Sequence, residues 1–263
     1  MLPAGSLEGR VCLVTGGGTG LGRAIALELS RLGAAVAVCG RRPQPLEETV
    51  GLLEGAGFAV RCDVRDPEQV ESAFGAVEGA LGPVTTLVNN AAGNFVAPAE
   101  QLSPNGWRAV VGIVLDGTFF CSRELARRHI ARGGERGEIA NMIATYAWTG
   151  GPGTVHSAAA KAGVLSLTRT LSVEWARHGI RVNALAPGAV DTPQAREHLW
   201  PDEEVQRAML AQIPLRRFGR EGEVAQACAF LVSDFAGYVT GECLTLDGGA
   251  WLNKGMFHFV KEE

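Results

Sequence analysis

Short apolar segments alternate with longer amphipathic segments along the whole chain. The spacing between most neighbouring apolar segments leaves room for a helix, which a connection between parallel strands requires. Two of these segments, residues 11–14 and 35–38, are apolar without interruption, as expected for central strands buried on both faces. The pattern predicts an α/β fold with a doubly wound parallel sheet. The expected strands are residues 11–15, 35–39, 59–62, 86–89, 138–143, 181–186 and 242–246.

Nothing in the sequence divides the 263 residues into separate domains. The chain carries no Pro- or Ser-rich linker, no block of like charge and no internal repeat, and α/β folds often reach about 250 residues as one domain. Residues 188–214 lack a clear strand and contain Pro193, Pro201 and an acidic cluster at 202–204. We therefore predict a single domain, residues 1–263, in which residues 188–214 form a loop and a short helix that cover the site.

The composition is that of a globular protein, with 46% hydrophobic and 20% charged residues. A formal net charge of −4 excludes a nucleic-acid binder that relies on bulk positive charge. The six cysteines stand singly, without zinc-type spacing, so we expect neither a metal site nor a disulfide scaffold. No apolar run reaches about 18 residues and no targeting signal is visible, so we expect no membrane association and a cytoplasmic location.

A glycine-rich loop, residues 15–22, follows the first expected strand and leads directly into a helical pattern. Glycines allow a tight turn and a close approach to a pyrophosphate, and the N-terminus of the helix offers unpaired N–H groups with a partial positive charge. Strand, loop and helix in this order predict a dinucleotide site, although a plain tight turn is the alternative. The expected cofactor contacts in this loop are Gly16, Gly18, Thr19, Gly20, Leu21 and Gly22.

The second expected strand ends in Arg41 and Arg42, where an NAD-preferring site usually has an acidic residue. Arginine donors suit a 2′-phosphate through charge-assisted, often bidentate hydrogen bonds. The alternative is a pair of solvated arginines at the start of a helix, where the helix dipole disfavours positive charge. The sequence therefore favours NADP(H).

Further cofactor contacts are expected after the third and fourth strands. Asp63 and Val64 follow the third strand, and Asn90, Ala91 and Gly93 follow the fourth. The carboxyl ends of parallel strands line one crevice, so Asp63 can reach an adenine amino group and the small residues leave room for ribose and nicotinamide. Each segment alone could be a capped turn, but together they trace a dinucleotide.

These motifs resemble those of the short-chain dehydrogenase/reductase family over nearly the whole chain. The matches are T-G-x-x-x-G-x-G at 15–22, N-N-A-x-G at 89–93, P-G at 187–188 and D-G-G at 247–249. The resemblance implies a Rossmann fold, an oxidoreductase activity with NADP(H), and cofactor contacts from Lys161, Pro187, Gly188 and Val190. It also implies a homotetramer formed through helices, for which the small residues at the start of the expected helix 158–178 are suited.

The chain departs from this family at its most characteristic position. Most members carry Tyr-x-x-x-Lys on a helix, whereas the matching residues here are Ser157 and Lys161, and the usual upstream serine is replaced by Ala144. A serine hydroxyl is a far poorer proton donor than a phenol with a pKa of about 10. Of the two tyrosines, Tyr146 stands just after the fifth strand and could supply the phenol from another wall, while Tyr238 is expected to serve packing.

This rearrangement is similar to that of the 2,4-dienoyl-CoA reductases, a branch with a Tyr at this upstream offset and a Ser before the Lys. Further matches to the branch lie at residues 62–67, 91–95 and 102–107. The resemblance implies an NADPH-dependent reductase of 2,4-dienoyl-CoA thioesters in fatty-acid metabolism. The trans-2-enoyl-CoA reductases share His156-Ser157 and remain close competitors.

The resemblance also implies roles for the catalytic candidates. Tyr146 would donate to the thioester oxygen, on which charge accumulates during reduction, Lys161 would bind the nicotinamide ribose, and Ser157 would make a secondary polar contact. The branch usually has Asn where this chain has Asp116, which could keep Lys161 protonated by a direct or water-bridged contact or could be an ordinary helix or turn aspartate. Candidates for binding the CoA phosphates are Arg41, Arg65 and Arg196.

Two readings from other classes stay open. The missing tyrosine at position 157 and the unusual Asp116 are compatible with an NADP-binding protein that does not catalyse. A ketoreductase or sugar-alcohol dehydrogenase with a relocated acid is a third possibility, which would turn over a ketone with little effect of CoA.

Overall fold

A computed structural model gives the structure of the chain and describes residues 2–192 and 202–253. Its centre is a seven-stranded sheet in the order β3-β2-β1-β4-β5-β6-β9, and every neighbouring pair is parallel. The predicted doubly wound α/β fold is thus confirmed. The strands are β1 (Val11–Thr15), β2 (Ala35–Gly40), β3 (Gly57–Arg61), β4 (Thr86–Asn89), β5 (Gly137–Met142), β6 (Ile180–Pro187) and β9 (Cys243–Leu246).

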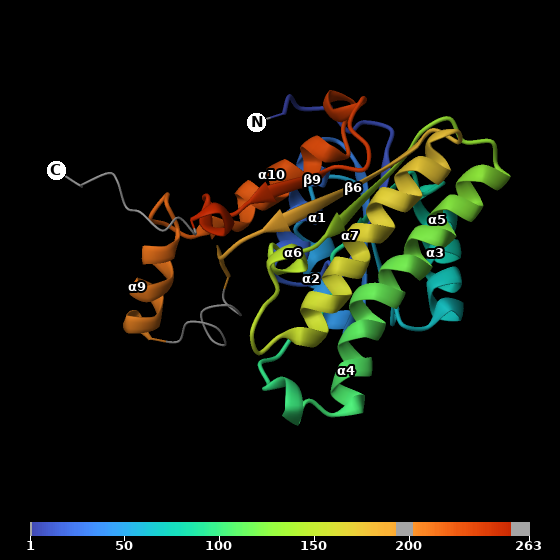
Figure 1. Ribbon diagram of the computed structural model, residues 1–263. Coiled ribbons are helices and arrows are strands. Elements are labelled where there is room, and N and C mark those ends of the chain that lie inside the picture. Colours follow the sequence, from blue (N-terminus) through green and yellow to red (C-terminus); the bar gives the residue numbers. More distant parts are fainter. Residues whose placement is uncertain (1, 193–201, 254–263) are drawn as a thin grey trace.

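Helices cover both faces of this sheet (Figure 1). One face carries α1 (Gly20–Arg31), α2 (Pro43–Val50) and α10 (Glu221–Leu231), and the other carries α3 (Pro67–Leu81), α5 (Gly117–Ala131) and α7 (Val155–Ala176). The remaining elements lie around the carboxyl edge of the sheet or connect these layers. They are α4 (Pro104–Val111), α6 (Tyr146–Thr149), α9 (Glu203–Gln212), a π-helical turn (Gly112–Asp116), three short 3-10 turns (Ala99–Gln101, Asp234–Ala236, Ala250–Leu252) and a small sheet of β7 (Val190–Asp191) and β8 (Gly219–Arg220).

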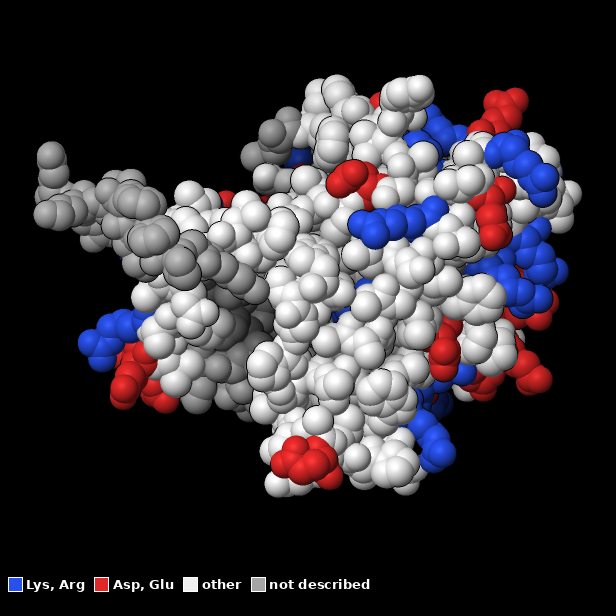
Figure 2. Space-filling view, viewed as in Figure 1, with Lys and Arg blue, Asp and Glu red and all other residues white. Residues whose placement is uncertain are grey.

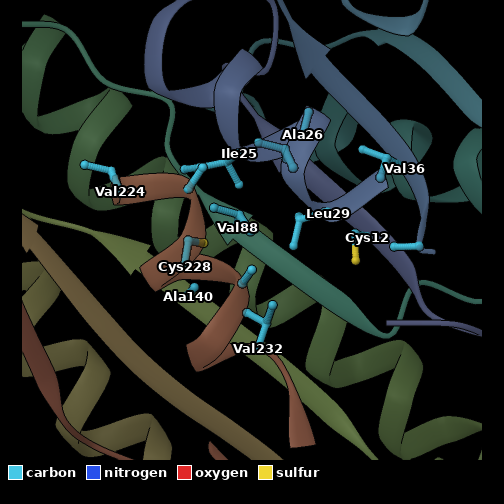
Figure 3. Packing of buried hydrophobic residues seen from close by; sticks show 14 of the residues in the cluster. Cys12, Ile25, Ala26, Leu29, Val36, Val88, Ala140, Val224, Cys228 and Val232 are labelled. Atoms are coloured by element: carbon cyan, nitrogen blue, oxygen red, sulfur yellow. The ribbon is translucent and has the colours of Figure 1, made fainter. Parts of the chain in front are cut away.

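The core explains why α1 and α10 lie against each other. Ile25 and Leu29 of α1 are fully buried, and Val224 and Cys228 of α10 recur at the same spacing of four residues on its inner face. A spacing of four places side chains on one face of a helix. Figure 3 shows these side chains meeting over the sheet next to Val88 and Ala140. This packing holds the N-terminus of α1 at the carboxyl edge of β1.

The third strand begins two residues before the predicted start, at Gly57, and ends at Arg61. The ladder with β2 runs from Val36 opposite Gly57 to Gly40 opposite Arg61, so Cys62 already lies beyond the last pair. The prediction missed Gly57, which has no side chain to contribute to an apolar pattern, and it also left out the apolar Phe58, which pairs with Ala37.

The segment predicted as a cover, residues 188–214, contains β7 and the ten-residue helix α9. Residues 193–201, including Arg196, lie outside the described residues. Its role as a cover for the site therefore stays a prediction. Within the described ranges, no helix is both long and apolar enough to cross a bilayer.

Candidate active site

Two adjoining cavities open at the carboxyl edge of the sheet, where the loops after the strands meet. The first has a volume of about 290 Å³ and the second about 530 Å³. Leu21, Asn90 and Ala92 line both. The two cavities therefore form one continuous region for an elongated ligand, which is the arrangement expected at this edge of a doubly wound sheet.

The glycine loop forms one wall of the first cavity, together with the loops after β2, β3 and β4. Most of the predicted cofactor residues line it: Gly16, Gly18, Thr19, Leu21, Gly22, Arg41, Arg42, Asp63, Val64, Asn90 and Ala91. Two predicted glycines of these loops do not line it. Gly20 instead begins α1 with a φ of 53°, and Gly93 faces the side chain of Ile113.

Side-chain hydrogen bonds tie the glycine loop to the loop after β4. The Thr15 hydroxyl accepts hydrogen bonds from the backbone N–H groups of Asn90 (3.0 Å) and Ala91 (2.9 Å). The Asn90 amide donates in turn to the carbonyl oxygens of Thr15 (3.0 Å) and Gly16 (3.3 Å). Thr19 forms no side-chain cap on α1, so N–H groups at the N-terminus of this helix are available to an anionic ligand.

The close packing of this loop makes Gly22→Ala a severe change. A Cβ at Gly22 would lie 2.2 Å from the carbonyl oxygen of Gly16 and 2.5 Å from Asn90 Nδ2, so the loop must shift. We expect the variant to lose measurable binding of a reduced nicotinamide dinucleotide by fluorescence titration. Gly79→Ala is the matched control, because a Cβ at Gly79 in α3 meets nothing within 4 Å. The Gly79 variant should bind the cofactor as the unmodified chain does and gain up to about 1 kcal/mol in stability. Normal cofactor binding by the Gly22 variant would contradict the packing argument.

Arg41 and Arg42 stand at the open side of the first cavity, where both side chains are exposed. Arg42 is the N-cap residue of α2. Neither arginine forms an ion pair with a carboxylate in the described part of the chain, so both guanidinium groups are available to an anion at this position.

Asp63 and Arg65 form a bidentate ion pair beside this cavity. Arg65 Nε lies 2.9 Å from Asp63 Oδ1, and Nη2 lies 2.5 Å from Oδ2. The hydrogen bonds from Arg65 lower the pKa of the Asp63 carboxyl below its usual value. Arg65, predicted as a candidate for CoA phosphates, is thus engaged with Asp63, while the carboxylate keeps lone pairs that can accept an adenine amino group.

Two of the four catalytic candidates, Tyr146 and Lys161, line the second cavity, whereas Ser157 and Asp116 do not. The walls of this cavity come from the strand ends and loops after β4, β5, β6 and β9, and from α9. The lining residues are Leu21, Asn90, Ala92, Asn94, Met142, Ile143, Ala144, Thr145, Tyr146, Lys161, Pro187, Gly188, Ala189, Val190, Thr192, Met209, Gln212, Ile213, Asp247 and Ala250. The predicted contacts Pro187, Gly188 and Val190 are therefore brought to the same cavity as Tyr146 and Lys161.

Tyr146 and Ser157 are in direct contact in this region. The phenol oxygen of Tyr146, the first residue of α6, lies 3.1 Å from the hydroxyl oxygen of Ser157, and either can be the donor. Ser157 is buried near the start of α7, one helical turn before Lys161. A separation of four residues places Ser157 and Lys161 on one helix face. The relocated tyrosine thus lies beside the serine that occupies the usual tyrosine position.

Lys161 is only 7% exposed, and its ammonium group donates a hydrogen bond to the carbonyl oxygen of Met142 at 2.5 Å. Burial lowers the pKa of Lys161 from 10.5 to about 8, because removing the charge from water disfavours the protonated form. Below pH 8 the group is mostly protonated and forms a fixed positive charge at the wall of the second cavity.

Asp116 is not placed as the hypothesis of a direct contact requires. It ends the π-helical turn Gly112–Asp116, its side chain is exposed, and no ion pair joins it to Lys161 in the described part of the chain. Burial alone accounts for the lowered pKa of Lys161. The structure thus shows no direct contact, and the water-bridged contact and the ordinary helix aspartate both stay predictions.

Several lining residues were not predicted from the sequence. Met209, Gln212 and Ile213 enter the second cavity because α9 and the residue after it lie against it. Pro45 and Leu46 of α2 line the first cavity. The sequence predicted a loop and a short helix within residues 188–214, but which residues of the helix face the site depends on how the helix docks.

Comparison with known proteins extends the likeness over nearly the whole chain. Residues 16–250 match the sequence model of the family described as "Enoyl-(Acyl carrier protein) reductase". A Bacillus subtilis protein named "Probable 2,4-dienoyl-CoA reductase", of the (2E)-enoyl-CoA-producing kind, is 47% identical, with 94% of this chain and 98% of the relative covered.

Two solved structures share the fold and a substantial part of the sequence. A short chain dehydrogenase from Bacillus anthracis has a TM-score of 0.85 and 40% identity, with 98% of this chain and 100% of that chain covered. An Agrobacterium tumefaciens protein described as a "putative 2-deoxy-d-gluconate 3-dehydrogenase", with bound NADP, has a TM-score of 0.87 and 36% identity, with 95% and 100% covered.

Proposed function

Because the chain belongs to the short-chain dehydrogenase/reductase family, we propose that it is an oxidoreductase that reduces a conjugated 2,4-dienoyl-CoA thioester with NADPH. The observation that carries this proposal is that Tyr146, held by its contact with Ser157, and Lys161 line a cavity that continues the first one. The B. subtilis relative, named as such a reductase, supports the choice of substrate.

The first cavity fits the adenosine and phosphate part of a dinucleotide. The glycine loop, the uncapped N-terminus of α1 and the exposed Arg41 and Arg42 are the donors that pyrophosphate and 2′-phosphate groups require. Bound there, NADPH supplies a hydride. The protein bound to NADP among the structural neighbours supports the same cofactor class.

The preference for NADPH is proposed to depend on Arg41 and Arg42. In a variant with both residues changed to alanine, we expect KM for NADPH to rise roughly 10- to 100-fold, the range that charge-assisted hydrogen bonds contribute. KM for NADH should change much less. Arg177→Ala, which removes an exposed arginine at the end of α7, is the control and should change neither value. Equal losses with both cofactors would contradict the assignment of the 2′-phosphate site.

The second cavity supplies the groups that the proposed reduction needs. When hydride adds to the far end of the conjugated diene, negative charge moves to the thioester oxygen. Tyr146 donates a hydrogen bond to this oxygen, which stabilises the charge as it develops. Ser157 holds the phenol by its 3.1 Å contact. Lys161 binds the nicotinamide ribose and adds a buried positive charge to the site.

Kinetics with three substrate classes test the proposal. Loss of NADPH absorbance should be seen with a 2,4-dienoyl-CoA and should far exceed the rate with a simple ketone. Turnover of a 2-enoyl-CoA but not of a dienoyl-CoA would contradict the proposal and support the alternative, an enoyl-thioester reductase, which the description of the matching family favours. Stabilisation by NADPH without any turnover would indicate a non-catalytic NADP-binding protein.

The exposed apolar residues support self-association, and we keep the homotetramer as a proposal. Figure 2 shows that the face over α4 and α7 has few charges in its middle, with most charged side chains at its rim. Trp107 of α4, Phe119 of α5 and Val173 of α7 are 39%, 38% and 79% exposed. Such residues are candidates for burial against a second copy. An acyl-CoA partner and a cytoplasmic location likewise stay predictions.

A further inference from the structure

Arg23, which none of the cofactor motifs includes, connects the glycine loop to α2. Its Nη2 donates to the carbonyl oxygen of Gly18 at 2.7 Å and to that of Pro45 at 3.3 Å. Its Nε donates to the Thr49 hydroxyl at 3.0 Å, and Nη2 also lies 3.0 Å from a carboxylate oxygen of Glu48. One guanidinium group therefore contacts the glycine loop and three residues of the neighbouring helix α2.

The same contact region is closely packed. A Cβ at Gly18 would lie 3.0 Å from Pro45 Cβ, so this glycine lets α2 approach the loop. Thr49 is fully buried, and its hydroxyl donates to the Pro45 carbonyl at 3.0 Å while accepting from Arg23. The distance between the glycine loop and α2 is thus held by charge-assisted hydrogen bonds, which are stronger and more directional than neutral ones.

The distance between the glycine loop and α2 matters because α2 begins at the two arginines that are proposed to bind the 2′-phosphate. Arg42 is its N-cap residue, and Arg41 precedes it. The glycine loop lies across the same cavity from them. A pyrophosphate on the loop and a 2′-phosphate on the arginines are parts of one molecule with a fixed separation, so both can be bound only if loop and helix keep their spacing.

We propose that Arg23 is a positioning residue for cofactor selection: by fixing α2 against the glycine loop, it places Arg41 and Arg42 at the separation that the 2′-phosphate requires. This inference rests on the proposed use of NADP(H). Arg23 acts through the backbone of Gly18 and through α2, and it lines neither of the two cavities.

The test measures binding of two fragments, 2′,5′-ADP and 5′-AMP, by isothermal titration calorimetry. They differ only in the 2′-phosphate, which the first carries. For Arg23→Ala we expect the preference for 2′,5′-ADP over 5′-AMP to fall roughly tenfold, equivalent to about 1.4 kcal/mol. Thr49→Val removes the acceptor of Arg23 Nε with little change of shape, and it should lower the preference by about threefold, consistent with the loss of one hydrogen bond. At saturating NADPH, kcat should stay within about twofold for both variants, since a lost spacing weakens binding and not the chemical step.

Arg31→Ala is the matched control. Arg31 lies on the same helix and is similarly exposed, 31% against 28% for the Arg23 side chain, but it pairs with Glu28 of its own helix. It should leave the preference unchanged. If the unmodified protein shows no preference for 2′,5′-ADP, the NADP(H) proposal itself fails. If it shows one and Arg23→Ala keeps it, or weakens both fragments equally, the role of Arg23 is overturned while the cofactor proposal stands.

Discussion

Tyr146→Phe should lower kcat for dienoyl-CoA reduction by roughly 10²–10³-fold, the usual cost of removing one donor to a developing oxyanion. The substitution keeps the ring and removes only the hydroxyl, so the shape of the second cavity is preserved. The binding of NADPH should be unchanged, because the proposed hydrogen bond of the Tyr146 hydroxyl goes to the thioester oxygen and not to the cofactor. Steady-state kinetics and a fluorescence titration on the same preparation separate the two effects.

Tyr238→Phe is the control for this prediction. Tyr238, the other tyrosine of the chain, is fully exposed and lines neither cavity, so the prediction that it serves packing within the chain is wrong. Removing the Tyr238 hydroxyl should leave kcat for dienoyl-CoA reduction unchanged. Full activity in the Tyr146 variant would remove the phenol from the mechanism and leave Ser157 as the remaining hydroxyl near Lys161.

Lys161→Met should abolish measurable turnover and at the same time stabilise the cofactor-free protein near pH 7. The buried ammonium is costly: lowering its pKa from 10.5 to about 8 corresponds to about 3 kcal/mol of lost stability while the group is charged. Methionine has a similar length and no charge. The net gain in stability should be about 1 kcal/mol smaller than this value, because the Met142 carbonyl loses its hydrogen-bond donor. Denaturant unfolding measures the stability.

The stability gain of the methionine variant should decrease as pH rises. The cost of the charged lysine is fully present below pH 8, shrinks as pH rises from about 8 to 10.5, and is absent above that range. The advantage of the methionine variant should shrink over the same range. In the unmodified enzyme, kcat/KM should fall as pH rises through about 8, since this ratio reports the free enzyme. If the methionine variant is less stable than the unmodified protein at every pH, the buried Lys161 ammonium does not destabilise the fold, and the account of its charge is wrong.

The sequence was informative where function depends on local order along the chain. Uninterrupted apolar segments predicted two central strands, and because parallel strands share a carboxyl edge, the loops at Thr15, Asp63 and Asn90 could be expected to meet. The i, i+4 spacing is sufficient to place Ser157 and Lys161 on one helix face. The structure adds the Tyr146–Ser157 contact, which no spacing rule specifies.

What could not be predicted depends on packing between distant elements. The exposure of Asp116 follows from how the π-helical turn is oriented between α4 and α5. The bonds of Arg23 depend on the docking of α2, which brings Thr49 and Pro45 to a residue more than 20 positions earlier. Amphipathic patterns predict which elements exist, whereas these contacts depend on the angle at which the elements meet.

The central claim is that a tyrosine from α6 replaces the usual helix tyrosine at the reacting centre. A crystal structure with NADP⁺ and a 2,4-dienoyl-CoA tests it most directly. We predict that the Tyr146 hydroxyl will lie within about 3.2 Å of the thioester oxygen, the distance a donor requires. A complex in which another group holds that oxygen and the ring of Tyr146 faces away from the ligand would contradict the account.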